Sequence, residues 1–493
     1  DMVLKGAAFF YGRKDAGYRV KDINFVAVKD GRIVGIGKEG EDAAFTGPDT
    51  KVYEFTKDRL IMPGIHDNHV HLLQAGMLSK YADLYSARTE EEAVAMAKEY
   101  ADAHPDDKWI IGIGWSKYAF KGLPSKKSID AVISDRPVML MDDELHSAWV
   151  NTAALEIAGI TNETPDPDYG EIQRDENGEA TGFLYETALS IAARIAFDFT
   201  DELVEELVST YMEKALRYGI TSITDMTPYL GIDLSYMNAY LKMAKEDKLK
   251  IRINAALDLF ADIEEVVAKR AKAEAEGKGF YRIPFLKQFV DGVPGNHTAM
   301  MLEDYSDRPG EKGGALLDLD KLNDAIEAAH LHGMSVRLHA CGDAAVRAAL
   351  DGYENAITKY GRGTSKHQVE HIEVIDPADI ERFAKAGIMA SVQPEHVVSG
   401  MPSFSDNNYP DILGPERTKY TWVFRQLLDT GAVLAGGSDC PVVEGSPFAG
   451  IYSGLERLHD DGTPEGGWNP QEKLTIEELL EIYTYLIKYE LLL

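Results

Sequence analysis

The stretch GITSITDM at residues 219–226 belongs to a series of short apolar runs that decides the fold class of this chain. Helical patterns separate it from similar runs at IRINAAL (251–257), FLKQFVDG (285–292) and SVRLHACGD (335–343). Between Ile223, Asn254 and Lys287 the runs recur roughly every 30 residues, which is the size of a strand–helix–strand unit. This alternation predicts parallel strands joined by helices.

Further runs extend the series to eight strands. They are residues 65–71, HQVEHI (367–372), IMASVQP (388–394) and AVLAGGSD (432–439). Eight parallel strands with intervening helices form a closed barrel. Acidic amphipathic segments at 201–216 and 262–279 are typical of helices on the outside of such a barrel. The predicted fold class is α/β, with a TIM-like (β/α)8 barrel over residues 63–75 and 216–493.

Two other regions are expected beside the barrel. Residues 1–62 alternate apolar positions around Asp30-Gly31, a dipeptide suited to a type I′ hairpin turn, and we predict that they form part of a small β-sandwich module. The interval between the first two barrel strands is far too long for one helix, and it contains its own strands, WIIGIGW (109–115) and PVMLM (137–141). We predict an inserted subdomain over residues 76–215.

Composition excludes several classes of protein. The 493 residues include 51 Lys and Arg against 82 Asp and Glu, a formal charge of −31 that disfavours nucleic acid and anionic membranes as partners. No apolar stretch approaches the roughly 20 residues that cross a bilayer. Only two cysteines, Cys341 and Cys440, occur, which favours a reducing compartment. We therefore expect a cytoplasmic protein that acts on a small molecule.

Histidines and one aspartate are placed as metal ligands would be. On a strand, His69 and His71 share a face, so both imidazoles can point at one ion. His339, His371 and Asp439 lie at the carboxyl ends of predicted strands, where barrel enzymes place their catalytic groups. Imidazole and carboxylate suit a divalent transition metal, with Zn²⁺ the default where open positions are needed.

These residues and their surroundings resemble the amidohydrolase superfamily, and more closely its amidohydrolase-3, YtcJ-like branch of metal-dependent hydrolases. The resemblance runs over nearly the whole chain. It rests on PGIHDNHVH (63–71), LHSAWVNTAAL (145–155), GEIQRDENGEATG (170–182), DGVPGNHTA (291–299), HACGDAAV (339–346), HQVEH (367–371), SVQPEH (391–396) and GGSDCPV (436–442).

The resemblance implies a centre with one or two divalent metals. His69 and His71 would hold one metal, His339 and His371 the second, and Asp439 would contact the metal. Lys287 stands where the superfamily often has a lysine that carbon dioxide carbamylates into an anionic bridge. An inward ammonium beside two dications would be repelled, so Lys287 would be carbamylated, deprotonated or paired with an acid. The alternative is that Lys287 faces outward.

The activity that the resemblance implies is hydrolysis of a C–N bond other than a peptide bond, in an amide or formamide-like substrate. A metal lowers the pKa of bound water from near 15.7 towards about 7, and the resulting hydroxide attacks the carbonyl. Asp439 would take the proton of the water and return it to the leaving nitrogen. The alternatives are a deaminase, an esterase or lactonase, an isomerase, or a binding protein without turnover.

Substrate contacts are expected from loops above the strand ends. The candidates are Trp115, His146, Asn151, His297 and Gln393. For Trp115 a packing role is about as favoured as a substrate wall. Asp67 lies on the same strand face as His69 and could orient a ligand imidazole, or it could be a solvated turn carboxylate.

The end of the chain departs from the family pattern. Members usually continue past the last barrel helix into a glycine-containing strand segment that completes the small β module, whereas this sequence ends at LTIEELLEIYTYLIKYELLL (474–493). Either a further C-terminal segment exists, or the module closes differently and leaves strand edges exposed. Such edges would favour a homo-oligomer.

Overall fold

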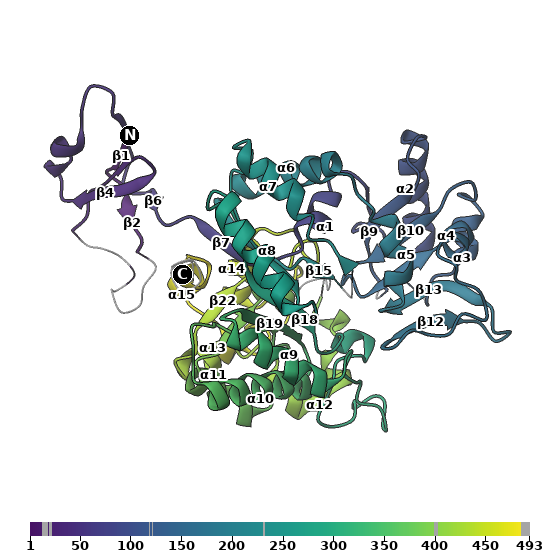
Figure 1. The fold of residues 1–493 in the computed structure, drawn as a ribbon. Helices are drawn as coiled ribbons and strands as arrows, with labels where there is room; N and C mark the ends of the chain where they lie inside the picture. The colour runs from purple at the N-terminus through teal and green to yellow at the C-terminus, as the bar shows by residue number, and fades with distance from the viewer. Residues whose placement is uncertain are drawn as a thin grey trace. The chain divides into compact units, whose positions relative to one another are not determined.

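The chain divides into two compact units (Figure 1). One contains residues 1–66 and the segment from Thr475, and the other contains Asp67–Leu474. The larger unit holds every candidate site residue predicted from the sequence. The computed structural model describes residues 1–11, 18, 22–117, 119–120, 122–229, 232–398 and 403–484.

The smaller unit is built on a four-stranded sheet in the order β4-β3-β1-β5. Its strands are β1 (Met2–Lys5), β3 (Phe25–Lys29), β4 (Arg32–Gly37) and β5 (Lys51–Glu54). Strands β3 and β4 form an antiparallel hairpin. Its two turn residues, Asp30 and Gly31, have φ of 50° and 71°, the positive values that a type I′ turn requires. The predicted hairpin is therefore confirmed.

The remaining elements of the smaller unit are short. Strand β2 (Ala8–Phe9) pairs with β6 (Leu60–Ile61), and helix α15 (Ile476–Thr484) is the last described element. Residues 485–493 lie outside the described residues, so the two predicted ways of closing the β module stay predictions. The β-sandwich arrangement likewise stays a prediction.

The core of the larger unit is an eight-stranded sheet, in which the strands from β14 to β22 pair in parallel. It runs in the order β22-β21-β20-β19-β18-β17-β14-β7. The strands are β7 (Ile65–Val70), β14 (Ile220–Asp225), β17 (Arg252–Asp258), β18 (Tyr281–Phe289), β19 (Ser335–Ala340), β20 (Gln368–His371), β21 (Met389–Val392) and β22 (Leu434–Gly436). The predicted α/β fold with eight parallel strands is confirmed.

The two edges of this sheet meet just beyond β22. Asp439 donates its backbone N–H to the carbonyl of His69 at 2.7 Å, and His71 donates to the carbonyl of Cys440 at 2.9 Å. Val70 and Cys440 form a parallel bridge. The sheet is thereby nearly closed into a barrel, and its closure joins two of the segments that carry candidate ligands.

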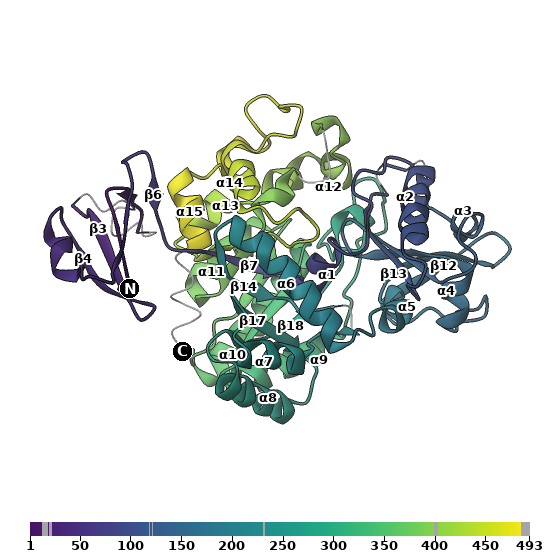
Figure 2. The ribbon, with the colours of Figure 1, turned by 90° about the horizontal axis from the view of Figure 1, so that it is seen from above.

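Helices cover the outside of the barrel (Figure 2). The predicted helices at 201–216 and 262–279 are α6 (Asp201–Arg217) and α8 (Ile263–Glu276). The Thr200 hydroxyl and the Asp262 carboxylate cap their first turns. The others after β14 are α7 (Met237–Lys245), α9 (Leu319–Leu331), α10 (Asp343–Tyr360), α11 (Ile380–Ala386), α12 (Tyr409–Arg417), α13 (Phe424–Asp429) and α14 (Pro447–Glu456), with the short strands β15 (Pro228–Tyr229) and β16 (Ile232–Asp233).

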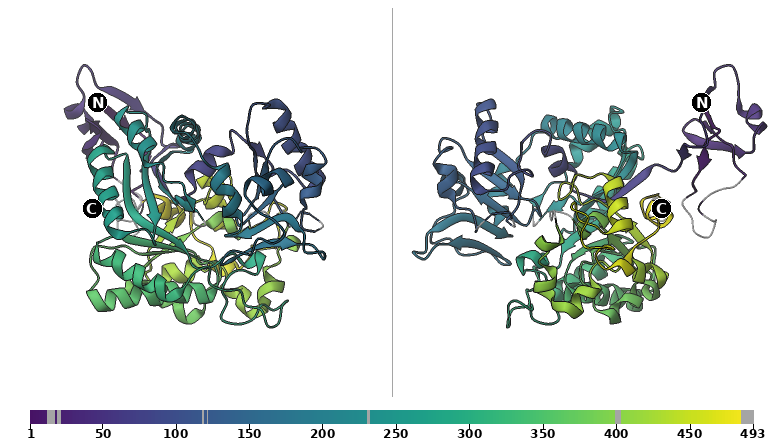
Figure 3. Two further views of the ribbon diagram at one scale, coloured as in Figure 1. Left: turned by 45° about the vertical axis from the view of Figure 1, so that its right-hand side comes forward. Right: turned by 180° about the vertical axis from the view of Figure 1, so that it is seen from behind.

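Between β7 and β14 the chain forms a second sheet, beside the barrel (Figures 1 and 3). Its order is β12-β13-β11-β10-β9-β8. The strands are β8 (Ala82–Asp83), β9 (Ile110–Trp115), β10 (Val138–Asp142), β11 (Ser147–Val150), β12 (Gly170–Arg174) and β13 (Ala180–Glu186). Besides α6, the helices of this interval are α1 (Leu72–Met77), α2 (Glu90–Ala103), α3 (Lys126–Asp130), α4 (Thr152–Ile157) and α5 (Leu189–Ala196).

This six-stranded sheet encloses a separate apolar core. Trp115, Trp149 and Phe183 are fully buried in it, together with Leu140 and Ile110. Strands β9 and β10 correspond to the runs WIIGIGW and PVMLM, and the inserted-subdomain boundaries at 76 and 215 stay a prediction. Within the described residues, no helix is both long and apolar enough to span a lipid bilayer.

Candidate active site

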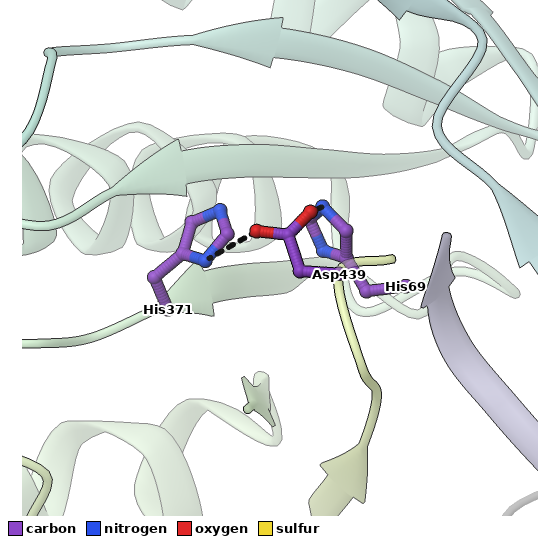
Figure 4. Close-up of side chains that lie close together, drawn as sticks. All are labelled: His69, His371 and Asp439. Atoms are coloured by element: carbon purple, nitrogen blue, oxygen red, sulfur yellow. Dashed lines mark ion pairs between the residues drawn. The ribbon is translucent and has the colours of Figure 1, made fainter. Parts of the chain in front are cut away.

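The carboxyl ends of the barrel strands bring most of the predicted ligands together. His69 lies near the end of β7, His339 near the end of β19, and His371 ends β20. Asp439 follows β22. Each of the four is at most 5% exposed. Figure 4 shows the Asp439 carboxylate between the imidazoles of His69 and His371.

The Asp439 carboxylate links three histidines. Its Oδ1 lies 3.2 Å from Nε2 of His69 and 3.2 Å from Nε2 of His71, and its Oδ2 lies 3.8 Å from Nδ1 of His371. One donor atom from each of His69, His371 and Asp439 lies within 4.8 Å of the other two. Imidazole nitrogen and carboxylate oxygen are donors that Zn²⁺ and similar ions take, so this set fits a divalent transition metal.

The imidazole ring of His339 lies beside that of His371. The ring centroids of His339 and His371 are 4.4 Å apart. Nε2 of His339 lies 3.1 Å from the carbonyl oxygen of Gly292, which fits an N–H that donates to it. A ligand histidine commonly holds its second N–H in this way, so Nδ1 is the nitrogen of His339 that could bind a metal.

Electrostatics favours the neutral, metal-binding form of three of these imidazoles. Burial lowers the pKa of His71, and it lowers those of His339 and His371 well below the ordinary value. Burial alone would raise the pKa of Asp439, but His69 and His71 outweigh it and hold that pKa well below its usual range. Asp439 is therefore ionised at neutral pH.

Two of the candidate ligands sit on strained backbone. His371 has φ of 72° and Asp439 has φ of 63°, values that side-chain-bearing residues rarely adopt. Such conformations cost roughly 1 kcal/mol or more, and they cluster at functional sites. Here they turn both side chains from the strand direction towards the rim.

The local structure explains why glycine and serine precede Asp439 in the sequence GGSD (436–439). A Cβ on Gly437 would lie 2.6 Å from the backbone nitrogen of His69, so only glycine lets the chain approach β7 this closely. Ser438 donates its N–H and its hydroxyl to the Asp67 carboxylate at 2.8 and 2.6 Å. Asp67 thus ties β7 to the segment that carries Asp439, and its carboxylate also accepts the backbone N–H of His69 at 3.3 Å.

Lys287 lies inside the barrel on β18. Its side chain is fully buried, and Nζ meets no hydrogen-bond acceptor among the described residues. Nζ lies 4.6 Å from the centroid of the Phe289 ring. Burial lowers the pKa of Lys287 to about 8. The outward orientation that the sequence left open is thus excluded.

The imidazole of His69 is held from behind by a residue that the sequence analysis missed. Nδ1 of His69 lies 2.6 Å from the carboxylate of Glu370, whose other oxygen accepts from Nε of Arg337 at 2.7 Å. All three residues are fully buried. Burial would raise the pKa of Glu370, but Arg337 and His69 hold it at about 2. Glu370 plays the orienting role that Asp67 was expected to fill.

A cavity of about 250 Å³ opens beside these groups. Of the predicted residues, the cavity is lined by His71, His146, His339, His371 and Asp439. His146 precedes β11 and lies opposite the metal-ligand candidates, with its ring centroid 5.3 Å from that of His339. Nδ1 of His146 lies 2.7 Å from the Glu186 carboxylate. Burial lowers the pKa of His146, but Glu186 outweighs it and raises the value to about 9.

The structure does not bring Trp115 and Asn151 to this cavity. Trp115 is packed against Trp149 and Phe183 in the core of the six-stranded sheet, and its indole N–H donates to the carbonyl of Leu140 at 2.9 Å. Asn151 caps α4, and its fully buried amide bonds only to backbone groups. For both residues the structure shows packing or capping in place of the predicted substrate contact.

His297 and Gln393 also lie away from the cavity wall. His297 lines a different hollow and pairs with Asp307 at 2.9 Å. Gln393 follows β21, is 1% exposed, and has no hydrogen-bond partner for either amide atom among the described residues. It is therefore a buried residue behind the rim.

The cavity has further polar walls that were not predicted. His396 lines it, with Nε2 at 3.9 Å from Oδ2 of Asp439. Glu373 and Glu395 also line it. Each follows a strand end by a few residues, so the reasoning that selected His371 and Gln393 could have found them. The aromatic wall is made by Tyr85, Phe289, Tyr409 and Trp422.

Comparison with known proteins gives the chain relatives over almost its full length. A model described as the amidohydrolase family matches residues 56–486. YtcJ of Bacillus subtilis (strain 168) is 31% identical over 485 residues, which are 97% of this chain and 88% of that protein. N-substituted formamide deformylase of Arthrobacter pascens is 24% identical over 473 residues, covering 93% of this chain and 84% of that enzyme.

A solved structure shares the fold. The crystal structure of an uncharacterized metal-dependent hydrolase from Pyrococcus horikoshii OT3 superposes with a TM-score of 0.76 and 23% sequence identity. The match covers 99% of this chain and 93% of that one.

Proposed function

The chain belongs to the amidohydrolase family and is a hydrolase, and we propose that it cleaves a C–N bond other than a peptide bond in an amide or formamide-like substrate. The observation that carries the proposal is the Asp439 carboxylate, which touches two imidazoles and lines the cavity. This places a base beside both a metal-binding donor set and a space for substrate. The similarity to N-substituted formamide deformylase supports the choice of bond.

The donor set fits one or two divalent ions, with Zn²⁺ the first choice. His69, His71, His371 and Asp439 would hold them, with His339 through Nδ1. A bound dication would supply a water of lowered pKa and would polarise the substrate carbonyl. The Glu370 carboxylate would keep Nε2 of His69 directed at the ion, because it holds the opposite ring nitrogen.

Lys287 is proposed as an additional ligand after carbamylation. Its buried amine has a pKa of about 8, so an appreciable fraction is unprotonated near neutral pH. The unprotonated nitrogen can form an N–C bond to carbon dioxide and release one proton, which yields an anionic carbamate. That anion would remove the cost of an unpartnered ammonium next to metal ions.

Asp439 would move the proton of the reaction. Ionised in the resting site, it accepts a proton from the attacking water, and its neighbours His69 and His71 fix the oxygen that does so. The same carboxyl group then returns the proton to the leaving nitrogen. On the opposite wall, the His146 imidazolium, paired with Glu186, could donate to a substrate oxygen as negative charge develops there.

The test is a screen of N-formyl, N-acyl and cyclic amide compounds with the zinc-loaded protein, followed by the substitution Asp439→Asn. We expect turnover to fall by more than about a thousandfold, because the proton carrier is lost, with metal content largely retained. Asp351→Asn, on an exposed part of α10, serves as the matched control. Normal turnover in the Asp439 variant would refute the proton role.

A further inference from the structure

The cavity is lined by many carboxyl groups. Of its lining residues, six bear carboxyl groups: Asp143, Glu144, Glu373, Glu395, Asp439 and Glu444. Neither lysine nor arginine occurs among the described residues that line it. Asp439 belongs to the histidine centre, and Asp143 and Glu144 form with Asp142 a second group whose carboxylate oxygens could hold a cation. The five carboxyl groups other than that of Asp439 have no role in the proposed reaction.

Side chains outside the cavity compensate two of these five carboxyl groups. Lys117 forms an ion pair with Glu144. Nζ of Lys214 lies 3.8 Å from the carboxylate of Glu444, which also accepts from the hydroxyl of Tyr218. Glu373, which is 7% exposed, accepts a hydrogen bond from the neutral hydroxyl of Tyr409 at 2.5 Å. Among the described residues, no cationic side chain forms an ion pair with the carboxyl group of Glu373.

Two further carboxyl oxygens are buried without a donor. Oε2 of Glu395 and Oδ1 of Asp143 meet no hydrogen-bond partner among the described residues. A buried carboxylate oxygen that lacks a donor is costly, and the cost disappears when a ligand supplies an N–H group. On the same cavity wall, Trp422 is 1% exposed and its indole N–H also has no acceptor. The residues that bear these unpartnered atoms all line the cavity.

The rest of the wall suits a short hydrocarbon chain. Leu145, Val293, Val443 and Phe289 contribute apolar surface to the same cavity. A volume of about 250 Å³ holds a small molecule rather than a polymer. A ligand that fits this lining has a polar reacting end, a few methylene groups and a positively charged end.

From this lining we propose that the enzyme selects substrates that carry a protonated nitrogen in addition to the C–N bond that is cleaved, such as a diamine acylated on one nitrogen. The inference rests on the proposed function, because it names the substrate class for the same site. The acylated nitrogen is the leaving group, and the second nitrogen contacts the carboxyl groups of Glu373 and Glu395.

The experiment compares three formamides that differ only in the charge at one end. They are monoformylated butanediamine, which is a cation, N-pentylformamide, which is neutral, and formamidopentanoate, which is an anion. With the zinc-loaded protein we expect kcat/KM for the cation to exceed that of the neutral compound by at least about tenfold, with the anion lowest. Equal values for the three would overturn the charge preference and leave the proposed function standing.

Two isosteric variants test whether Glu373 and Glu395 cause the preference for a cationic substrate. Glu373→Gln and Glu395→Gln should each reduce the ratio of cation to neutral kcat/KM by about fivefold, because each removes a charge and keeps an acceptor oxygen. Glu381→Gln, whose carboxylate is 69% exposed on α11, should leave the ratio unchanged. An unchanged ratio in both cavity variants would overturn the assignment.

Binding without turnover separates the inference from the proposed function. Calorimetry on the zinc-loaded protein should give butylammonium at least about tenfold tighter binding than butanol, whether or not any formamide is cleaved. Cleavage of none of the three formamides, with this binding difference present, would count against the proposed bond and not against the charge preference. Equal binding would overturn the preference. A third outcome would also overturn the preference: if the protein binds more than two metal ions per chain tightly and Glu395→Gln lowers that number, the carboxyl groups bind metal and not a substrate cation.

Discussion

The barrel interior and the six-stranded sheet are buried to the same degree but filled with different side chains. In the barrel, Lys287, Arg337 and Glu370 are fully buried, and the ammonium of Lys287 has no acceptor. In the sheet, Trp115 and Trp149 are as deeply buried, within an apolar cluster. Burial of a charge destabilises the folded protein, whereas burial of an aromatic ring stabilises it. The comparison separates a region organised for chemistry from one organised for stability.

The largest expected effect tests the barrel side of this comparison. The double substitution His69→Ala and His71→Ala removes two nitrogen donors beside Asp439. We expect the purified variant to lose its bound metal and its turnover to fall by more than about a thousandfold. It should still show a cooperative unfolding transition. Metal analysis and thermal unfolding measure the two properties on one sample.

A matched control uses histidines outside the site. His104→Ala and His332→Ala remove two exposed imidazoles that bond to backbone carbonyls on their own helices. Their metal content should equal that of the unaltered protein. Unchanged metal in the His69 and His71 variant would exclude these residues as ligands.

The next effect tests the sheet side. Trp115→Ala empties a large space between Trp149 and Phe183, so we expect the free energy of unfolding to fall by about 3–5 kcal/mol. Trp115→Phe should cost less, because it keeps a ring in the cluster. The folded fraction of either variant should retain its KM, measured with a compound that the unaltered enzyme cleaves. A raised KM with an unchanged free energy of unfolding would instead support the predicted role of Trp115 in substrate binding.

The difference between the two regions also explains which sequence predictions held. Eight apolar runs at regular spacing predicted the barrel, because the period of a strand–helix unit does not depend on the side chains at the rim. The same reasoning could not separate Trp115, which ends β9, from an aromatic residue of the cavity such as Phe289, which ends β18. Only the packing of β9 against β10 and β13 decides that Trp115 is core, while Trp422 borders the cavity.

For the site, position at a strand end was visible in the sequence but side-chain direction was not. His371 and Asp439 point to the rim on backbone with positive φ, a conformation that no local propensity of histidine or aspartate requires. Glu370 is adjacent to His371 and was overlooked, because strand alternation sends it to the barrel interior, where it meets His69 from a strand 301 positions away. Such long-range pairs follow from the closed sheet.

A smaller effect is expected where the two regions meet, at the pair of His146 and Glu186. The folded pKa of His146, about 9, lies above its unfolded value of 6.5. The pair therefore stabilises the metal-free protein fully below pH 6.5, and this contribution is lost as pH rises through 9. It amounts to at most about 3 kcal/mol. Urea unfolding of the metal-free protein between pH 6 and about 10 measures it.

The matched variant for this pH dependence is Glu186→Gln, which removes the charge and keeps one acceptor oxygen where the carboxylate has two, one facing His146 and one facing the Thr298 hydroxyl. Its stability should change less across the same pH range. A slope identical to that of the unaltered protein would assign the pH dependence to other groups.

The smallest effect concerns the buried charges themselves, and it decides whether they serve the metal or only the fold. Glu370→Gln keeps the shape of the side chain but removes the charge that holds Nδ1 of His69 and pairs with Arg337. We expect metal affinity to fall by about 10–100-fold, as when a ligand histidine loses its orienting carboxylate. Competition with a chelator measures this. Glu472→Gln, which alters another fully buried carboxylate in contact with Arg425 and Gln426, should destabilise the protein and leave its metal affinity unchanged. If both variants lose stability and neither loses metal affinity, the Glu370–Arg337 pair supports the barrel in the way that Trp115 supports the sheet, and the contrast between the two regions disappears at this point.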